Sequence, residues 1–585
     1  MGTISDKLMR IINTKEDIRQ ALISKGYDVP TSIPFKEYAK MILDLPCKVD
    51  SFPDIEGIVA RYSASGLTNE QMAANPVWVD KTGNGHDLQM KNFAWGGMSG
   101  VGGYEMNFNL WTNNVPSIPD ISMSTTTTSV SVSVGNSTYN NNLIYIHMNN
   151  WDINKNHWLK VTSTYEDGDL VFKFYNDNNS KNIELPANGY VNIPAYPEFK
   201  GNYMYISTTS NKQGSFTIEQ LPLYPGALVF DGVDDYGVCE NFPILTKEKG
   251  YTVVALRQWI SMGEGISGLV SNVKNWFNDG AFVLEYNGNN ATNKFVNRPV
   301  SFGNVNIEMD LPNNFTYQTS KSYKGVPITT GSFKGTNSLF VGKLNNIIGN
   351  YSNVAIWELV FLDHDATEEE LTKIKDYFVK TYPWLFPDQA WTVVGKTNED
   401  EDRATIANIT GNGNDLVLSN FGFAEGSGYN EEGEYAGYLV TDGVDDKIIS
   451  SIFKMGNDWT VIGDWELINT GKNDNAGIVK FDSIVIYNYN YNSILINIKN
   501  GRNILIPDQN TVNAICSDGR IYSKDWKESI YNEEAESTSK NFLTIGYSGN
   551  AYTKIAFKNL AIYPTVLSRE DCIKAYNYLQ TLKAK

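Results

Sequence analysis

The chain has 585 residues, of which 19% are charged, with a net charge of −18 and a pI near 4.8. This acidic balance argues against nucleic acid and anionic membrane as main partners, because both require a basic face. A hydrophobic content of 41% is sufficient for several buried cores, and the length suits about four domains. The four cysteines lie far apart without a C-x-x-C pair, so the sequence signals neither a zinc site nor a disulfide framework.

The first 46 residues differ from the rest of the chain. They carry apolar residues at helical spacing, namely Ile4, Leu8, Ile11, Ile18 and Leu22. Short amphipathic helices bury little surface alone and therefore need a partner. We predict that residues 1–46 are an attachment and oligomerisation segment; a helical cap on the next domain is the alternative. The sequence contains neither a signal-type apolar run at its start nor a membrane-spanning window, so we expect a soluble protein without membrane insertion.

Three landmarks occur twice in the same order. The turn Gly-Asn-Gly at residues 83–85 returns at 411–413, the turn Asp-Gly-Val-Asp-Asp at 231–235 returns at 442–446, and a helical pattern from Thr367 returns from Ser568. An ordered repetition of this kind predicts two copies of one domain.

The separations between the copies predict an insertion. They are 328 residues for the first landmark, 211 for the second and 201 for the third. The large drop implies that the first copy holds about 117 extra residues, the size of a small domain. The predicted domains are a helical segment at 1–46, a first repeat at 47–104 and 226–385, an inserted β-sandwich at 105–225, and a second repeat at 386–585.

From residue 47 onward the pattern is almost entirely β. In the insertion, Val130, Val132 and Val134 alternate with serine, and residues 170–174 follow Asp-Gly at 167–168, a pair that predicts a hairpin turn. Each repeat ends in one expected helix, at residues 367–378 and at residues 568–579, which begin with Thr-x-x-Glu and Ser-x-x-Asp.

The set of repeated motifs resembles the laminin-G-like, concanavalin-A-like jelly-roll family. The resemblance rests on the Gly-Asn-Gly turn, the Asp-Gly-Val-Asp-Asp turn, the strand Ala-Ile-Trp-Glu-Leu at 355–359 and the closing helix. It implies a mainly β fold with two jelly-roll sandwiches, used in this family for glycan or protein binding. Asp80 before the first turn is replaced by Asn408 in the second copy, which favours a turn-capping role over a charged site.

The leader resembles the short N-terminal segment of tailed-phage virion proteins, notably those of crAss-like phages. The likeness rests on Ile-Ser-Asp-Lys-Leu at 4–8, Ile-x-x-Ala-Leu at 18–22 and Phe-x-x-Tyr-Ala-x-x-Ile at 35–42. It implies a virion protein made in the host cytoplasm, a head or tail fibre. The expected partners are further copies of the chain, as a trimer, and capsid or tail proteins, with host-surface glycans as possible ligands.

Two acidic groups are candidate calcium sites, because clustered carboxylates suit this hard cation. They are Asp231, Asp234 and Asp235, and Asp442, Asp445 and Asp446. A structural turn, with carboxylates accepting backbone N–H groups, is the favoured interpretation. The family's hydrolases carry Glu-x-Asp-x-x-Glu on one strand; no such strand is found here, and Glu368–Glu370 lies at a helix start. We therefore expect no catalytic residues, no cofactor and no metal.

Tyrosines are the candidate glycan contacts. Tyr487, Tyr489 and Tyr491 alternate with asparagine, which places the three rings on one face of a strand. Exposed rings offer a flat apolar surface for sugar stacking, whereas buried rings are only core, and core is the favoured interpretation. The sequence thus predicts a non-enzymatic virion fibre that adheres to host glycans; a glycan-processing enzyme and a purely architectural capsid or neck protein are the alternatives.

Overall fold

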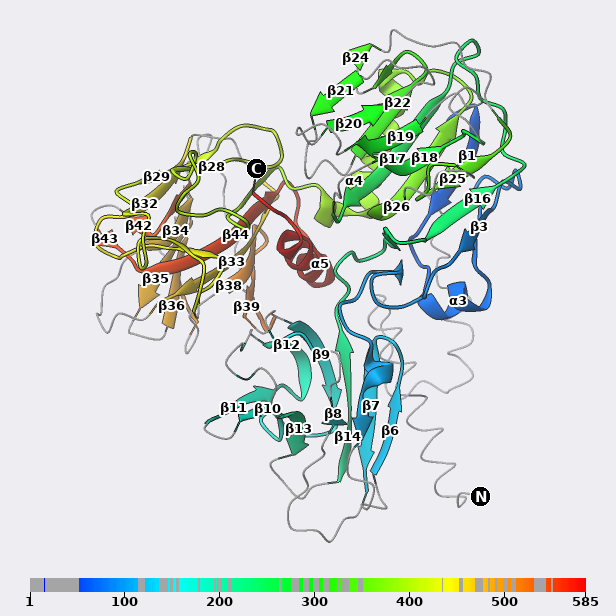
Figure 1. Cartoon of the computed structure of the whole chain (residues 1–585). Coiled ribbons are helices and arrows are strands. Elements are labelled where there is room, and N and C mark those ends of the chain that lie inside the picture. The colour runs from blue at the N-terminus through cyan, green and yellow to red at the C-terminus, as the bar shows by residue number, and fades with distance from the viewer. Residues whose placement is uncertain are drawn as a thin grey trace. The chain divides into compact units, whose positions relative to one another are not determined.

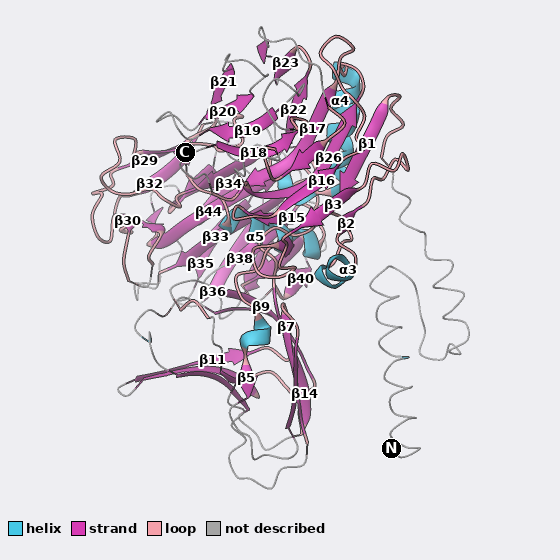
Figure 2. Ribbon diagram, turned by 45° about the vertical axis from the view of Figure 1, so that its right-hand side comes forward, coloured by secondary structure: helices cyan, strands magenta, loops and turns pink. Residues whose placement is uncertain are grey.

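A computed structural model describes residues 52–584, together with Lys15, apart from internal gaps. The longest gaps cover residues 136–145, 275–282, 328–335, 469–476 and 531–542. Strands dominate the described chain and helices are few (Figure 2). The expected fold class, mainly β with antiparallel sandwiches, is confirmed. The predicted attachment residues Ile4, Leu8, Ile11, Ile18 and Leu22 lie outside the described residues.

The first sandwich consists of two antiparallel eight-stranded sheets (Figure 1). One sheet contains β1 (Ile58–Ser63), β4 (Gly100–Val101), β15 (Leu228–Asp231), β17 (Thr252–Trp259), β22 (Phe315–Thr319), β23 (Ser322–Tyr323), β24 (Val326–Pro327) and β26 (Asn353–Leu362). The other contains β2 (Val77–Trp78), β3 (Leu88–Lys91), β16 (Tyr236–Cys239), β18 (Ile266–Ser271), β19 (Val283–Asn287), β20 (Lys294–Asn297), β21 (Val305–Glu308) and β25 (Leu339–Val341). Side chains of both sheets share one buried core, as in other sandwiches.

The second sandwich repeats this arrangement with its own two eight-stranded sheets. One contains β27 (Gln389–Thr392), β30 (Gly428–Asn430), β31 (Tyr438–Val440), β33 (Thr460–Leu467), β38 (Val512–Cys516), β39 (Arg520–Ser523), β40 (Glu528–Ile530) and β44 (Ile555–Tyr563). The other contains β28 (Thr405–Ile406), β29 (Leu416–Ser419), β32 (Lys447–Ser450), β34 (Gly477–Phe481), β35 (Ile484–Tyr489), β36 (Ser493–Ile498), β37 (Arg502–Ile506) and β41 (Leu543–Ile545).

The two sandwiches match strand for strand. The order β4-β15-β26-β17-β22 corresponds to β30-β31-β44-β33-β38, and β3-β16-β25-β18-β19 corresponds to β29-β32-β41-β34-β35. Two irregularities in the pairing also recur. The register shifts between Leu256 and Arg257 in β17 and between Asp464 and Trp465 in β33, and it shifts again within β18 and β34. Since a bulge sets local twist and side-chain direction, the copies share detailed backbone geometry as well as topology.

Each sandwich carries one closing helix, as the sequence predicts. Helix α4 (Glu368–Thr381) starts with a capping box between Thr367 and Glu370, and α5 (Arg569–Gln580) starts with Ser568, whose hydroxyl accepts the N–H of Asp571. All eight residues of β17 are buried, because the strand is central in its sheet and is covered on both faces. Helix α4 supplies part of that cover through Phe378, whose ring lies 6.0 Å from that of Phe315 in β22.

The segment between β4 and β15 forms its own sheets around a separate core. A five-stranded sheet contains β6 (Ile121–Thr125), β7 (Ser129–Val134), β9 (His157–Ser163), β12 (Asn188–Ile193) and β14 (Gly214–Gln220), and a three-stranded sheet contains β10 (Leu170–Asn176), β11 (Asn179–Leu185) and β13 (Tyr203–Thr208). The prediction of a hairpin at residues 167–168 is wrong. The tight turn exists, with Gly168 at φ +83°, but it joins β9 to β10 in different sheets, because β10 pairs with β11 and β13.

Candidate functional site

The first acidic turn, at residues 231–235, links β15 to β16 and is closed by its own carboxylates. Oδ1 of Asp231 accepts the N–H groups of Val233 at 2.7 Å and of Asp234 at 3.3 Å, and Oδ2 of Asp235 accepts the N–H of Asp231 at 3.0 Å. Gly232 has φ +78°, and a Cβ there would lie 2.8 Å from the Cβ of Asn353. The turn therefore needs glycine for both its conformation and its close packing.

The second acidic turn, at residues 442–446, reproduces these bonds. Oδ1 of Asp442 accepts the N–H groups of Val444 at 2.7 Å and of Asp445 at 3.2 Å, and Oδ2 of Asp446 accepts the N–H of Asp442 at 2.8 Å. An asparagine just after the neighbouring strand, β3 or β29, also has the same role in both copies. Nδ2 of Asn92 donates to the carbonyl of Asp234 and Nδ2 of Asn420 to that of Asp445, both at 3.0 Å.

The last aspartate of each turn has an unusual environment. Asp235 and Asp446 are fully buried, and burial raises the pKa of Asp235 to about 7 and that of Asp446 to about 6, although hydrogen bonds to Ser99 and Ser427 oppose the shift. In each turn the three carboxylates lie close enough to hold a metal ion. However, two of the three already accept backbone N–H groups, and burial disfavours the ionised form of the buried one that a metal ion would need. The geometry favours a turn closed by carboxylates over a calcium site.

The prediction that Asp80 and Asn408 cap equivalent turns is confirmed. Oδ1 of Asp80 accepts the N–H groups of Arg61 and Thr82, both at 3.0 Å. Oδ1 of Asn408 accepts the corresponding N–H groups of Ala390 at 3.2 Å and Thr410 at 3.1 Å. A carboxylate oxygen and an amide oxygen can both accept these hydrogen bonds, so the charge of Asp80 is not required at this position.

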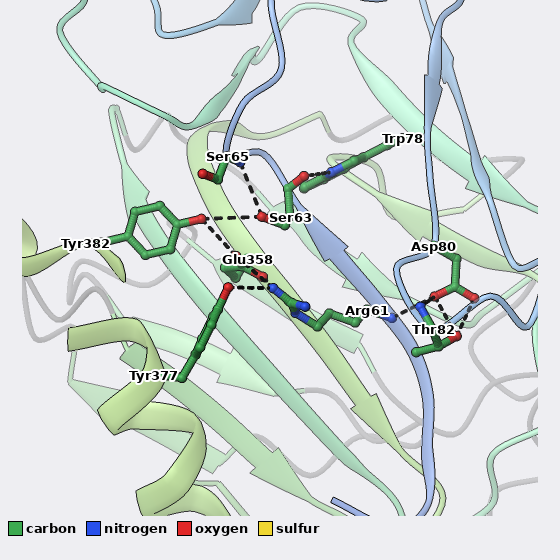
Figure 3. Close-up of polar contacts among 9 residues, drawn as sticks. All are labelled: Arg61, Ser63, Ser65, Trp78, Asp80, Thr82, Glu358, Tyr377 and Tyr382. Atoms are coloured by element: carbon green, nitrogen blue, oxygen red, sulfur yellow. Dashed lines mark hydrogen bonds and ion pairs between the residues drawn. The ribbon is translucent and has the colours of Figure 1, made fainter. Parts of the chain in front are cut away.

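A buried ion pair lies in the first sandwich (Figure 3). Nε of Arg61 on β1 lies 3.2 Å from Oε2 of Glu358 on β26, and the two side chains are 5% and 0% exposed. Two tyrosines at the closing helix complete the network: the guanidinium donates to Oη of Tyr377 at 2.8 Å, and Oη of Tyr382 donates to Oε1 of Glu358 at 2.8 Å. Burial and the Glu358 carboxylate raise the pKa of Tyr382 well above its ordinary value. Without solvent access, this network positions the helix and its junction on the sheet.

A lysine and two tyrosines lie together beside the first acidic turn, and the sequence analysis missed them. Nζ of Lys343 lies 4.3 Å from the ring centre of Tyr236 and 5.6 Å from that of Tyr351, and the two ring centres are 6.2 Å apart. All three side chains are half-buried. We call these residues the first tyrosine–lysine cluster.

The second sandwich has a corresponding group, which we call the second tyrosine–lysine cluster. Nζ of Lys447 lies 5.9 Å from the ring centre of Tyr547, and the rings of Tyr547 and Tyr552 lie 5.1 Å apart with their planes at 40°. These residues are also half-buried. No linear motif marks either cluster, because about 100 residues separate its first member from the other two. Only an alignment of the two repeats, strand by strand, places the members at equivalent positions.

The predicted glycan-contact tyrosines lie at the limit of the described structure. Tyr487 and Tyr489 are on β35, where Tyr487 pairs with Leu495 and Tyr489 with Ser493. Tyr491 lies outside the described residues. The strand is thus present, and the stacking role of the three rings remains a prediction.

Within the described residues, no helix is both long enough and apolar enough to cross a membrane.

Comparison with protein-family models and with curated proteins gave no match. Among solved structures, a Trypanosoma rangeli sialidase in complex with sialic acid is 8% identical and covers 80% of this chain and 85% of its own, with a TM-score of 0.24.

Two further solved structures are similar at the same low level. The binding domain of botulinum neurotoxin serotype D is 13% identical over 60% of this chain and 89% of its own, with a TM-score of 0.24. Domain 4 of a GH43 extracellular arabinanase from Geobacillus stearothermophilus, in complex with arabinotriose, is 11% identical over 32% of this chain and 100% of its own, with a TM-score of 0.20. Values this low carry no argument about activity or ligand.

Proposed function

We propose that the protein is a structural component of a tailed-bacteriophage virion, a head fibre or tail fibre of the crAss-like type. In this proposal residues 1–46 attach the protein to the particle, and the β-sandwiches are displayed for adhesion to host-surface glycans. The observation that carries the proposal is the pairing of two closely matched sandwiches on one acidic chain with a leader whose pattern resembles that of phage virion proteins.

Repeated binding modules suit adhesion, because several weak contacts made at once give a much stronger attachment than one. Two equivalent sandwiches per chain, brought together in a homotrimer through the leader, would present six modules to the host surface. The partners of this assembly are the other two copies of the chain and the capsid or tail proteins that hold the leader. The protein is made in the host cytoplasm and carried in the virion.

We propose a non-enzymatic role. Glycoside hydrolysis generally uses two carboxyl groups that face one sugar ring. The buried carboxylates of the described residues are engaged otherwise: Glu358 pairs with Arg61, while Asp80, Asp235 and Asp446 accept backbone N–H groups at turns. These arrangements support a binding module in preference to a glycan-processing enzyme.

Gold labelling of purified phage particles tests the virion assignment. Antibodies raised against the second sandwich, residues 386–585, should decorate intact particles at one fixed structure, the head or the tail. The assignment would be contradicted if the protein is abundant in the lysate but the purified particles do not bind the antibody and contain no peptides of the protein by mass spectrometry. Binding of labelled protein to host cells separates an adhesive fibre from a purely architectural protein.

A further inference from the structure

The two tyrosine–lysine clusters occupy equivalent positions in the two sandwiches. Tyr236 and Lys447 begin the paired strands β16 and β32, which have the same register against β25 and β41. Lys343 and Tyr547 each follow a glycine with positive φ, at +77° and +74°. The third members, Tyr351 and Tyr552, each lie three residues before the corresponding residues Val354 and Ile555, which pair with the equivalent strands β17 and β33.

The chemistry of the cluster is retained although two of its three positions have changed. In the first cluster the order along the chain is tyrosine, lysine, tyrosine; in the second it is lysine, tyrosine, tyrosine. The amine and one ring have therefore exchanged places across the same strand pair, and each site still holds one amine and two rings. A single cation–π contact would need only one ring. The second ring is half-buried in both clusters and lies against the first, which gives each site more aromatic surface than one cation–π contact needs.

Each acidic turn leads directly into a member of its cluster, since Asp235 precedes Tyr236 and Asp446 precedes Lys447. Burial, the neighbouring Tyr236 and the Asp234 carboxylate all raise the pKa of Tyr351, which places Asp234 within electrostatic reach of the cluster. Asp234 and its counterpart Asp445 are exposed. Each surface thus combines flat apolar rings, an ammonium donor and a carboxylate acceptor. Rings contact the C–H face of a sugar, while charged donors and acceptors bind its hydroxyl groups.

We propose that each tyrosine–lysine cluster, with the exposed aspartate of the adjacent turn, forms a binding site for a neutral pyranose residue of a surface glycan. This inference rests on the proposed function and gives its ligand a chemical class. Acidic sugars fit poorly, because the two aspartates of each turn that are not fully buried outnumber the single lysine amine and repel an anion. The two sites on one chain make attachment bivalent, so individually weak sites suffice.

Binding of the full-length chain to immobilised polysaccharides tests the inference. Mannan, galactan and glucan are the neutral probes, and polysialic acid is the acidic probe. We expect the parent chain to bind at least one neutral polysaccharide. Tyr351→Ala and Tyr552→Ala should each weaken that binding by about tenfold to a hundredfold through loss of bivalency, and the double variant should lose it. The matched control is Tyr175→Ala, which removes a tyrosine 44% exposed in the inserted sandwich and should change nothing.

Three results would overturn the inference: no binding of the parent to any neutral probe, binding to polysialic acid alone, or parental binding by a folded double variant. The thermal midpoint of each variant establishes whether it is folded; if Tyr351→Ala unfolds the chain, Tyr351→Leu keeps the apolar volume and removes the flat ring. Particle labelling distinguishes the underlying proposal. Protein on the particle without glycan binding removes only this inference, whereas glycan binding by a protein absent from particles removes only the virion assignment.

Discussion

The two sandwiches differ in chemistry where their closing helices cover the sheet. Arg61 and Glu358 form a buried ion pair in the first, whereas the equivalent positions in the second hold Ala390 and Asn559. Asn559 is fully buried, and neither of its side-chain polar atoms has a hydrogen-bond partner within the described structure. The fold therefore accepts either an ion pair or uncharged residues at this site. We infer that the ion pair serves the packing of one helix and is not a general requirement of the fold.

The surface beside the acidic turns shows the opposite behaviour. Its residues have exchanged places, yet its chemistry of one amine, two rings and an aspartate is the same in both copies. A helix-covered position that changes chemistry and an exposed position that retains it point to different constraints. Under the helix, either an ion pair or neutral side chains are compatible with a stable fold. The half-buried cluster, in contrast, behaves like a site selected for what it contacts.

The largest expected effect comes from removing one member of the ion pair. Glu358→Ala should lower the free energy of unfolding by about 3–5 kcal/mol, because the Arg61 guanidinium would stay buried without its partner. Asn559→Ala, the matched change in the second sandwich, should cost far less, since Asn559 has no partner to lose within the described structure. Chemical unfolding of both variants measures the difference.

The double variant Arg61→Met, Glu358→Leu is the control for this prediction. Apolar side chains of similar volume remove the desolvation cost of both charges, so most of the lost stability should return. A double variant as unstable as Glu358→Ala would show that the charges themselves, and not the unpaired arginine, determine the stability of this region.

The next effect depends on pH. Burial raises the pKa of Asp235 to about 7, whereas an unfolded aspartate has a pKa near 3.9, so the folded chain binds the additional proton between these values. The contribution of this carboxyl to the free energy of unfolding should consequently be largest at the acid end and fall by roughly 3 kcal/mol as the pH rises from about 4 to about 7. Asp235→Asn should flatten this decline. Urea unfolding at pH 4, 5.5, 7 and 8 measures it, and an unchanged slope would refute the burial of an uncharged carboxyl.

The second turn should show the same dependence over a narrower range. The pKa of Asp446 is raised to about 6, so the contribution of this carboxyl to stability is lost by about pH 6. Asp446→Asn should therefore remove a smaller part of the decline than Asp235→Asn. Comparison of the two variants in one series shows whether the pH dependence of stability is larger for the first turn, as the two pKa values indicate.

A smaller effect is expected at the first residue of each turn. Asp231→Ala and Asp442→Ala should each cost about 1 kcal/mol, through loss of the hydrogen bonds that their carboxylates accept. Added calcium should leave the melting temperature of the parent unchanged. A clear upward shift with calcium, absent in the Asp231→Ala variant, would assign the turn to metal binding instead.

The smallest effect is expected from deleting the inserted sandwich. The cut should retain residues 221–225, because the N–H groups of Leu223 and Tyr224 donate to the carbonyls of Gly103 and Gly102. A chain without residues 105–220, closed by a short linker, should keep a cooperative melting transition, since the second sandwich lacks this segment and still carries the same strand order. Loss of cooperative unfolding would show that the insertion is part of the first core.

Sequence reasoning reached the features that depend on local chemistry. The closing helices were predictable from their caps at Thr367 and Ser568, and the capping by Asp80 and Asn408 from the amide-for-acid replacement. The short helix α3 (Asn69–Ala74) was missed, because only the cap at Thr68 marks it and its six residues are too few for a periodic pattern.

Features that depend on tertiary pairing were not predictable. The Asp-Gly turn at 167–168 is typical of a hairpin, but the partners of β10 decide that it links two sheets. The tyrosine–lysine clusters were hidden for a related reason. A residue-by-residue alignment of the repeats detects identical residues. At these positions Tyr236 is aligned with Lys447, and Lys343 is aligned with Tyr547. Only the shared register of the strands shows that the exchange preserves one chemical group.

Particle assembly tests most directly the proposed division of the chain into an attachment segment and displayed sandwiches. Phage particles can be produced with the full chain or with a chain starting at Cys47. We predict that the shorter chain folds with an unchanged melting temperature, sediments as a monomer and is absent from purified particles, while the full chain is a trimer and is incorporated. Equal oligomeric state and equal incorporation of the two chains would contradict it.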